Sequence, residues 1–309
     1  MGYVVIDLEF NRMDNIEKHY PNIYLEHEYL KDIDIESEII EIGAIKVDQY
    51  MKVEEELKVY IKPSIFPVLN PEIINITKIT NEDLEKGISF EEAMTKLKEF
   101  TGNNILCSWA KDDIAQIIIN SHYHKYEDIK WVNKYIDIQE YVTKVIGAKK
   151  SLSLKNALTR LNIKADSNLL HDALNDAYFT VQAFKQLYNY RIVKNYIVNN
   201  VYDMPAINLK CVDNIKLNYN MIKSSCPKCR RKIILDFDYM PARWRFISVG
   251  ICSKCHSAVL NEVIVKKTLL GKVIYSEIGS ILNEIEYSDY SYRLEKYFIK
   301  KEKKILSIM

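Results

Sequence analysis

The chain opens with three segments dominated by β-branched and other apolar residues, and its pattern then changes. Such runs predict β-strands, here at residues 3–10, 38–48 and 55–63. Further along, apolar residues recur at helical spacing in segments separated by short apolar runs. Helices are expected at 89–102, 112–123, 139–147, 153–161 and 172–189, and strands at 104–109 and 130–138. Three strands followed by such an alternation predict an α/β fold, a mixed sheet flanked by helices.

The same pattern divides the chain into three parts. Residues 1–190 carry the predicted α/β domain, and residues 191–225 show no single apolar face, which predicts a connecting segment. Residues 226–309 form a second domain with 16 Lys and Arg against 9 Asp and Glu, a net charge of +7, whereas the preceding part carries −6. A basic module beside an acidic one predicts an anionic partner for the first and metal cations for the second. Within the basic domain we expect a helix over residues 277–301.

Composition narrows the class of protein. The 309 residues are 48% hydrophobic and 28% charged, as in ordinary globular proteins. No segment approaches the roughly 20 apolar residues of a membrane helix, and the N-terminus lacks the basic start of a signal peptide. We therefore expect a cytoplasmic protein without membrane contact. A long polar stretch at 11–37 joins the first two strands, and connections of that length are usually functional or disordered.

Two acidic residues interrupt the first predicted strand. Alternate side chains of a strand point to opposite faces, so Asp7 and Glu9 share one face with Val5. Unpaired buried carboxylates are costly, so the pair predicts a positive partner. Lysine or arginine would serve, but a divalent ion accounts for the whole set of acids, and oxygen ligands favour Mg²⁺ or Mn²⁺.

The segment HDALNDA at 171–177 resembles the start of a helix. Asp172 is placed to act as the N-cap, with its side chain accepting from backbone near Asn175. His171 and Asp176 are five residues apart, so they converge only when His171 lies in the preceding loop and Asp176 in the first turn. Helix capping alone would also explain this cluster.

Three segments together resemble a known family. They read VIDLEF at 5–10, CSWAKDDIAQI at 107–117 and HDALNDA at 171–177. In this order they are similar to the motifs of the DEDDh 3′–5′ exonucleases, the DnaQ-like group with an RNase H-like fold. The resemblance covers residues 3–190 and identifies five candidate catalytic residues: Asp7, Glu9, Asp113, His171 and Asp176.

The middle motif departs from the family pattern at two points. Ala110 stands where RNA-trimming members often have glycine, and two adjacent aspartates compete for one role. The four-residue offset from Trp109 favours Asp113 and leaves Asp112 as the expected helix cap.

The resemblance implies hydrolysis of phosphodiester bonds from a 3′ end by two metal ions. Asp7, Glu9, Asp113 and Asp176 would hold two Mg²⁺ or Mn²⁺, and His171 would accept the proton of the attacking water. Leu8 and Phe10 are expected near the terminal base, although core packing also explains both. The partner would be single-stranded nucleic acid, with RNA favoured over DNA by the middle motif. A catalytically silent scaffold and a polymerase-associated proofreading factor are the alternatives; the sequence leaves protein partners open.

Four cysteines form two Cys-x2-Cys pairs, at Cys226 and Cys229 and at Cys252 and Cys255. Two such pairs predict a tetrahedral site for one structural Zn²⁺, a zinc ribbon. Disulfides are the rival, and a cytoplasmic chain disfavours them.

Basic and aromatic residues alternate within this second domain. The pattern is typical of phosphate contact combined with base stacking. The expected substrate-binding residues there are Arg230, Arg231, Arg243, Trp244 and Arg245, with Phe246 beside them. A small core formed by Trp244 and Phe246, with the arginines in solvent, is the simpler alternative, and zinc ribbons also bind proteins.

Overall fold

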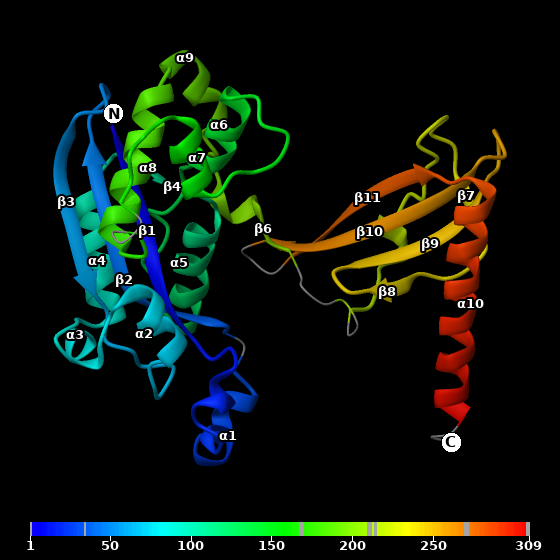
Figure 1. The fold of residues 1–309 in the computed structure, drawn as a ribbon, viewed down its shortest axis with the longest axis horizontal. Coiled ribbons are helices and arrows are strands. Elements are labelled where there is room, and N and C mark those ends of the chain that lie inside the picture. The colour runs from blue at the N-terminus through cyan, green and yellow to red at the C-terminus, as the bar shows by residue number, and fades with distance from the viewer. Residues whose placement is uncertain are drawn as a thin grey trace. The chain divides into compact units, whose positions relative to one another are not determined.

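The computed structural model describes residues 2–33, 35–166, 170–208, 212, 215–268 and 272–306. The chain forms two compact units, Met1–Tyr202 and Asp203–Met309 (Figure 1). Their boundary falls inside the segment expected to connect two domains. Val198 pairs with Tyr135 of the first unit, whereas strand β6 (Pro205–Asn208) pairs with β10 (Ala258–Thr268) of the second. Backbone pairing on both sides of the boundary therefore assigns most of this segment to the two units.

The first unit is built on a five-stranded sheet in the order β3-β2-β1-β4-β5. Strands β1 to β3 are antiparallel neighbours, and β4 and β5 add parallel to β1. The strands are β1 (Tyr3–Arg12), β2 (Ser37–Val47), β3 (Val53–Tyr60), β4 (Ile105–Ser108) and β5 (Tyr135–Asp137). The predicted mixed sheet is confirmed, although β5 is much shorter than the run at 130–138 that suggested it.

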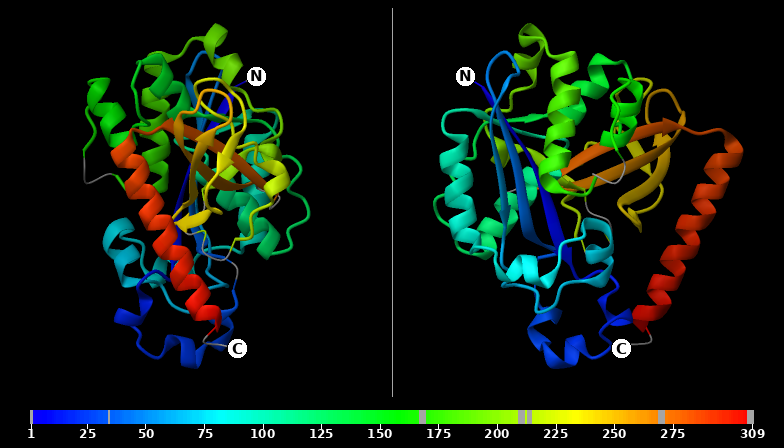
Figure 2. Two further views of the ribbon diagram at one scale, coloured as in Figure 1. Left: turned by 90° about the vertical axis from the view of Figure 1, so that its right-hand side faces the viewer. Right: turned by 60° about the vertical axis from the view of Figure 1, so that its left-hand side comes forward.

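Helices cover both faces of this sheet (Figures 1 and 2). One face packs on α8, with α6 and α7 beside it, through a core that includes Val5, Ala177 and Phe184. The other carries α4 and α5. The helices are α2 (Pro71–Thr77), α3 (Asn81–Glu85), α4 (Phe90–Thr101), α5 (Asp112–Tyr123), α6 (Ile138–Val145), α7 (Leu154–Arg160), α8 (Ala173–Leu187) and α9 (Tyr190–Val193). The five predicted helices are present within two residues of their expected ends.

One glycine lets α8 approach the sheet. Gly43 lies opposite Asp7 in the β1–β2 register, and a Cβ added to it would come within 2.2 Å of the Ala173 backbone. Ala173 and Ala177, both fully buried, keep the facing side of the helix small. This close contact brings the first turn of α8 directly over the centre of the sheet.

The long connection at 11–37 is folded within its described residues. It contains α1 (Ile23–Glu26) between short 3-10 turns and has its own apolar cluster, formed by Ile16, Ile23, Leu30, Ile35, Ile65 and Phe66. Buried Glu38 anchors the end of this segment, because its carboxylate accepts backbone N–H bonds from Ser64, Ile65 and Phe66 at 2.5–2.9 Å. Of the two expectations for this segment, functional or disordered, disorder is contradicted for its described residues.

Within its described residues the second unit contains a sheet of six strands, β11-β10-β9-β7 with β6 paired to β10 and β8 paired to β9. Its strands other than β6 and β10 are β7 (Ile233–Leu235), β8 (Met240–Ala242), β9 (Arg245–Cys252) and β11 (Val273–Ile281). Side chains alternate along β9, so Ile247 and Val249 pack with Leu294 of α10 (Glu284–Leu306) while Phe246 faces a second cluster with Tyr239 and Val263.

The helix expected over 277–301 begins later than predicted. Glu277–Ile281 is the end of β11, which pairs with β10 along nine residue pairs, and α10 starts at Glu284. Pairing with β10 makes Glu277–Ile281 a strand, and the spacing of apolar residues within the segment could not reveal this pairing. Among the described residues no helix combines the length and the apolar character needed to cross a membrane.

Candidate active site and metal centre

Three carboxylates meet where α8 crosses the sheet. Asp7 and Glu9 project from β1 and Asp176 from the first turn of α8, and one oxygen of each lies within 4.8 Å of the other two. The expectation that Asp7 and Glu9 share a face is confirmed, and their face is the one that α8 covers. A register shift between Glu9 and Phe10 marks a bulge in the β1–β2 ladder just beyond the acids. The sheet therefore presents both acids to a third that is 167 positions or more away in the sequence.

The electrostatics of this cluster are unfavourable without a counter-charge. Burial raises the pKa of Asp7 well above its usual range, and the charges of Asp113, Asp176 and Glu9 raise it further. Burial, followed by the nearby Glu41 and Asp176 charges, raises the pKa of Glu9 to about 8. The pKa of Asp176 is also raised by burial. Each of these carboxylates disfavours the ionisation of the others. They can therefore all be ionised at once only when cations are bound beside them.

One oxygen of Asp176 provides a direct test of whether the site fits a metal. Its Oδ2 accepts the His171 backbone N–H at 3.1 Å, whereas its Oδ1 is buried and has no hydrogen-bond partner. A buried acceptor without a donor is rare in folded proteins and calls for an ion or water. Carboxylate oxygens alone form the group, and that ligand set suits hard divalent cations such as Mg²⁺ and Mn²⁺.

Asp113 approaches the same cluster from a different element. It lies in the first turn of α5, and its charge is the neighbouring charge that raises the pKa of Asp7 most. Burial raises the pKa of Asp113 itself to about 7. The prediction that Asp112 caps α5 is wrong: the N-cap is Lys111, which has no side-chain cap bond, and Asp112 is the first helical residue. The exposed Asp112 contributes only a favourable charge at the helix N-terminus.

The segment 171–177 is arranged as its sequence predicts. Asp172 is the N-cap of α8, and its Oδ1 accepts the Asn175 N–H at 3.1 Å. His171 precedes the helix in a left-handed conformation with φ 69°, and it is exposed. Its backbone N–H and then its charge partly offset the burial that raises the pKa of Asp176, so His171 lies close to the acid cluster. An exposed imidazole beside buried acids is suited to exchange protons with a water at the site.

The comparisons with known proteins agree with this geometry. The sequence matches the exonuclease family over residues 4–184. The chain belongs to the exonuclease family. With its acids on β1, α5 and α8 and a histidine before α8, it is of the DEDDh type and so an enzyme of the 3′–5′ exonuclease class.

Individual relatives support the same assignment. The DNA polymerase III subunit epsilon of Aquifex aeolicus (strain VF5) is 28% identical over 183 residues, which span 59% of this chain and 78% of that protein. The PolC-type DNA polymerase III of Ureaplasma parvum is 26% identical over 187 residues, covering 60% of this exonuclease and only 12% of the polymerase. The nuclease domain of 3′hExo, a DEDDh family member solved with rAMP, is 16% identical with a TM-score of 0.50 and covers 60% of this chain and 90% of that domain. That structure shares the fold, and the second unit lies outside the family match.

The exonuclease has two further charged residues at its acid cluster that sequence reasoning missed. Glu41 lies directly opposite Glu9 in the β1–β2 register and is only 1% exposed. Lys58 on β3 forms an ion pair with Glu41 at 2.9 Å and another with Asp172, the N-cap of α8. Burial alone would lower the pKa of Lys58, but these two acids outweigh it and raise the pKa. The available signal was a lone glutamate, Glu41, inside the apolar run IIEIGAI at 39–45.

We expect Lys58→Met to weaken both folding and catalysis. It leaves Glu41 buried without its partner, and breaking a buried pair costs about 3 kcal/mol of unfolding free energy. It also releases the start of α8, so kcat should fall about tenfold or more through misplaced groups. Chemical denaturation and kcat measure the two effects. Lys46→Met is the matched control, because Lys46 pairs with the exposed Glu55 at 2.7 Å. Equal losses in both variants would contradict a special role for Lys58.

The raised pKa of Glu9 predicts a pH dependence of metal-free stability. A carboxyl whose pKa rises from 4.5 to about 8 on folding favours the folded state while protonated. Its contribution is therefore present below about pH 4.5 and is lost as the pH rises toward about 8. In EDTA, Glu9→Gln should match the wild-type Tm near pH 4.5 and exceed it near pH 8. Added Mn²⁺ should raise the wild-type Tm most at the higher pH. A difference between the two proteins that does not change with pH would contradict this expectation.

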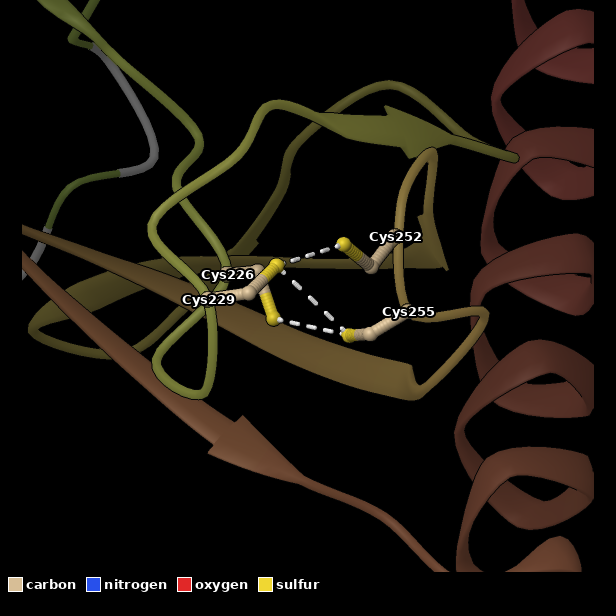
Figure 3. A group of neighbouring side chains, drawn as sticks. All are labelled: Cys226, Cys229, Cys252 and Cys255. Atoms are coloured by element: carbon tan, nitrogen blue, oxygen red, sulfur yellow. Dashed lines mark hydrogen bonds between the residues drawn. The ribbon is translucent and has the colours of Figure 1, made fainter.

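The four cysteines converge at one end of the second sheet (Figure 3). Their sulfurs lie 3.3 Å apart for Cys229 and Cys252, 3.6 Å for Cys226 and Cys255, and 3.6 Å for Cys229 and Cys255. A tetrahedral metal with Zn–S bonds of about 2.3 Å separates its sulfurs by roughly 3.8 Å, whereas a disulfide brings them to about 2.05 Å. The cysteines are free of disulfides, and the cluster has the ligand set and spacing of a structural metal site.

The two cysteine loops share one backbone design. In each, the carbonyl of the first cysteine accepts the N–H of the residue four positions on, Arg230 at 2.8 Å and His256 at 3.1 Å. Both of those residues adopt left-handed φ angles, 59° and 55°. Hydrogen bonding with Ser257 lowers the pKa of Cys255 to about 6, which favours the thiolate that a metal requires. Repeated loop geometry therefore aims both pairs at a common point.

The basic and aromatic residues expected to bind substrate in this unit do not lie together. Arg230 and Arg231 follow the first cysteine loop at the Cys252 end of β9, while Arg243 and Trp244 form the turn at its other end. Seven residues of strand separate these ends by roughly 23 Å. Register along β9, which spacing in the sequence does not reveal, keeps them apart.

The members of that set also differ in what they contact. Arg245 is paired with Glu262 at 3.0 Å and lies over the Trp244 ring at 4.8 Å. Phe246 is buried in the core, as the simpler interpretation held, whereas Trp244 is 42% exposed. In the exonuclease unit, Leu8 is 3% exposed, so its side chain belongs to the core and is not free to meet a base; Phe10 is half-buried with Arg12 over its ring.

Proposed function

We propose that this exonuclease removes nucleotides from the 3′ end of single-stranded RNA or DNA, with RNA favoured, by hydrolysis with two divalent metal ions. The observation that carries the proposal is the convergence of Asp7, Glu9 and Asp176 within 4.8 Å, with one buried oxygen left without a donor. Asp113 on α5 is proposed as the fourth ligand because its charge acts on Asp7, although it lies outside the group of acids within 4.8 Å of one another. Buried acids that oppose one another's ionisation are unfavourable for folding, and a catalytically silent scaffold would gain nothing from them.

In this proposal each residue has a distinct task. Asp7, Glu9, Asp113 and Asp176 hold two Mg²⁺ or Mn²⁺, which when bound supply charge stabilisation and an activated water at the scissile phosphate. His171 would accept the proton of the attacking water, since it is exposed and its charge acts on Asp176 of the cluster. Lys58 and Glu41 hold the start of α8 against the sheet and so fix the position of Asp176.

The cysteine cluster is proposed to hold one structural Zn²⁺. Four thiols in two loops of identical design support this choice, because zinc prefers a tetrahedral sulfur site. The exposed Arg230, Arg231, Arg243 and Trp244 remain candidates for contact with nucleic acid, now as two separate surfaces and not one.

The test is digestion of oligonucleotides that carry a 5′ label. Purified protein is incubated with single strands of RNA and of DNA of one sequence, in Mg²⁺, Mn²⁺ or EDTA. We expect a ladder that shortens from the 3′ end, faster on RNA, and no reaction in EDTA. Failure on both polymers with either metal would overturn the proposal, and faster digestion of DNA would overturn only the preference.

A second candidate is proofreading in association with a polymerase. It is supported by similarity to the Aquifex aeolicus subunit epsilon, of which the match spans 78%. Such an enzyme should remove a mismatched 3′ nucleotide from a duplex faster than a paired one and should retain a polymerase in a pull-down. Equal rates of removal of mismatched and paired 3′ nucleotides, together with full activity on single strands in the absence of a polymerase, would favour the free-standing enzyme.

A further inference from the structure

Helix α10 has two chemically different sides. One side packs on β9 and β10 through a cluster in which Leu294 is fully buried, and the helix contributes Tyr287, Tyr290, Leu294 and Phe298 to it. These residues follow one another at intervals of three and four positions, the spacing of one helical face. The large apolar side chains of this face are therefore already used to hold the helix on the sheet.

The other side carries a row of positive charge. Arg293, Lys296, Lys300 and Lys303 follow one another at intervals of three, four and three residues, and all four are exposed. At 3.6 residues per turn they fall within an arc of about 80°, on the side away from Leu294. The row spans about 15 Å of helix, or one charge about every 5 Å. Figure 1 shows that the helix continues past the edge of the sheet.

Ion pairs do not occupy these four cations within the described part of the chain, although Asp289 lies one turn before Arg293 on the same side of the helix. No described carboxylate forms an ion pair with any of the four. Arg293 and Lys296 instead lie over the rings of Tyr290 and Tyr292, at 5.8 and 5.7 Å. Tyr292 is itself 62% exposed beside the row. An exposed aromatic ring next to evenly spaced cations has the chemistry of a surface for single-stranded nucleic acid.

We propose that this face of α10 binds the sugar-phosphate backbone of the nucleic acid, with Tyr292 stacking on a base. The inference rests on the proposed function, since it places part of the substrate on the second unit. Charge complementarity selects the partner, because a regular row of cations matches a chain of phosphates. An anionic lipid surface fits less well, since amphipathic helices bind membranes through an apolar face and here that face is covered by the sheet.

The test compares two triple variants of the full chain. Lys296→Gln, Lys300→Gln and Lys303→Gln together remove most of the row, while Lys149→Gln, Lys150→Gln and Lys155→Gln remove three exposed lysines from the first unit. Binding of a labelled 20-nucleotide single strand is measured in EDTA at several KCl concentrations. The α10 variant should bind about 10- to 100-fold more weakly at 0.1 M salt, with the slope of log K against log salt reduced by about 2. The control variant should keep the wild-type affinity and slope.

Two further measurements separate the outcomes. Tyr292→Ala should weaken binding without changing the salt slope, and all of these variants should hydrolyse a dinucleotide at the wild-type rate. Unchanged oligonucleotide binding by the α10 variant overturns the inference. Binding to vesicles of anionic phospholipid is measured in parallel, and an α10 variant that loses only its binding to vesicles also overturns the inference. If the protein binds oligonucleotides through α10 but degrades no substrate, the proposed function is contradicted and the inference about this surface is supported.

Discussion

Asp7→Asn is expected to lower kcat on a short single-stranded oligonucleotide by about a thousandfold or more, roughly 4 kcal/mol of transition-state stabilisation. Asp7 is the residue on which the charges of Asp113, Asp176 and Glu9 all act, so it lies at the centre of the cluster. An amide in its place removes the negative charge that a shared cation requires. Steady-state hydrolysis in Mg²⁺ and in Mn²⁺ measures the loss.

The same variant provides a check against misfolding. In EDTA at pH 8, Asp7→Asn should be more stable to heat than the wild type, because it deletes a carboxylate whose ionisation burial opposes. Asp112→Asn is the matched control, since Asp112 is exposed at the start of α5, and its kcat should change less than about twofold. Wild-type activity in Asp7→Asn, or an equal loss in the control, would refute the proposed metal site.

Cys252→Ser is expected to abolish zinc binding and with it the ordered structure of the cysteine end of the second unit. Cys252 is fully buried at the end of β9, in a small cluster with Cys226, Ile233 and Val259. So few apolar contacts offer little stability by themselves, whereas structural zinc contributes about 10–16 kcal/mol of binding free energy in small zinc domains. The unfolding transition of the second unit should therefore be lost or shifted by more than about 10 °C.

Metal analysis of the purified protein makes this prediction quantitative. The wild type should contain one zinc per chain and Cys252→Ser none, while Cys107→Ala, which alters a buried cysteine of the first sheet, should keep its zinc. Hydrolysis of a dinucleotide should survive in Cys252→Ser, because the acid cluster lies wholly in the first unit. Zinc retained in Cys252→Ser, or absent from the wild type, would contradict the assignment.

Several features could be predicted because they depend on neighbours in the sequence. Two acids at alternate positions of an apolar strand must share a face, so the orientation of Asp7 and Glu9 followed from strand geometry alone. The roles of Asp172 as cap and of His171 as a loop residue depend on contacts within a few residues. The cysteine loops likewise close through bonds between residues four and five positions apart.

Other features depended on which strands pair and in what register. Glu41 becomes a neighbour of Glu9 only through the β1–β2 ladder, and Lys58 reaches it only from β3. The strand over Glu277–Ile281 exists because β10 pairs with it. The separation of Arg230 from Trp244 follows from the length of β9.

The sequence by itself predicted the fold class, the candidate acids and histidine of the active site and the four cysteines of the candidate metal site. The fold class and the cysteine pairs follow from periodicity and spacing along the chain, whereas the candidate acids and histidine follow from the resemblance of three motifs to the DEDDh family. The tertiary structure alone decided which charges support those acids, how close α8 comes to the sheet at Gly43, and which basic residues share a surface. These depend on pairings between distant segments, which are selected by the packing energy of the whole chain and not by any short stretch of it.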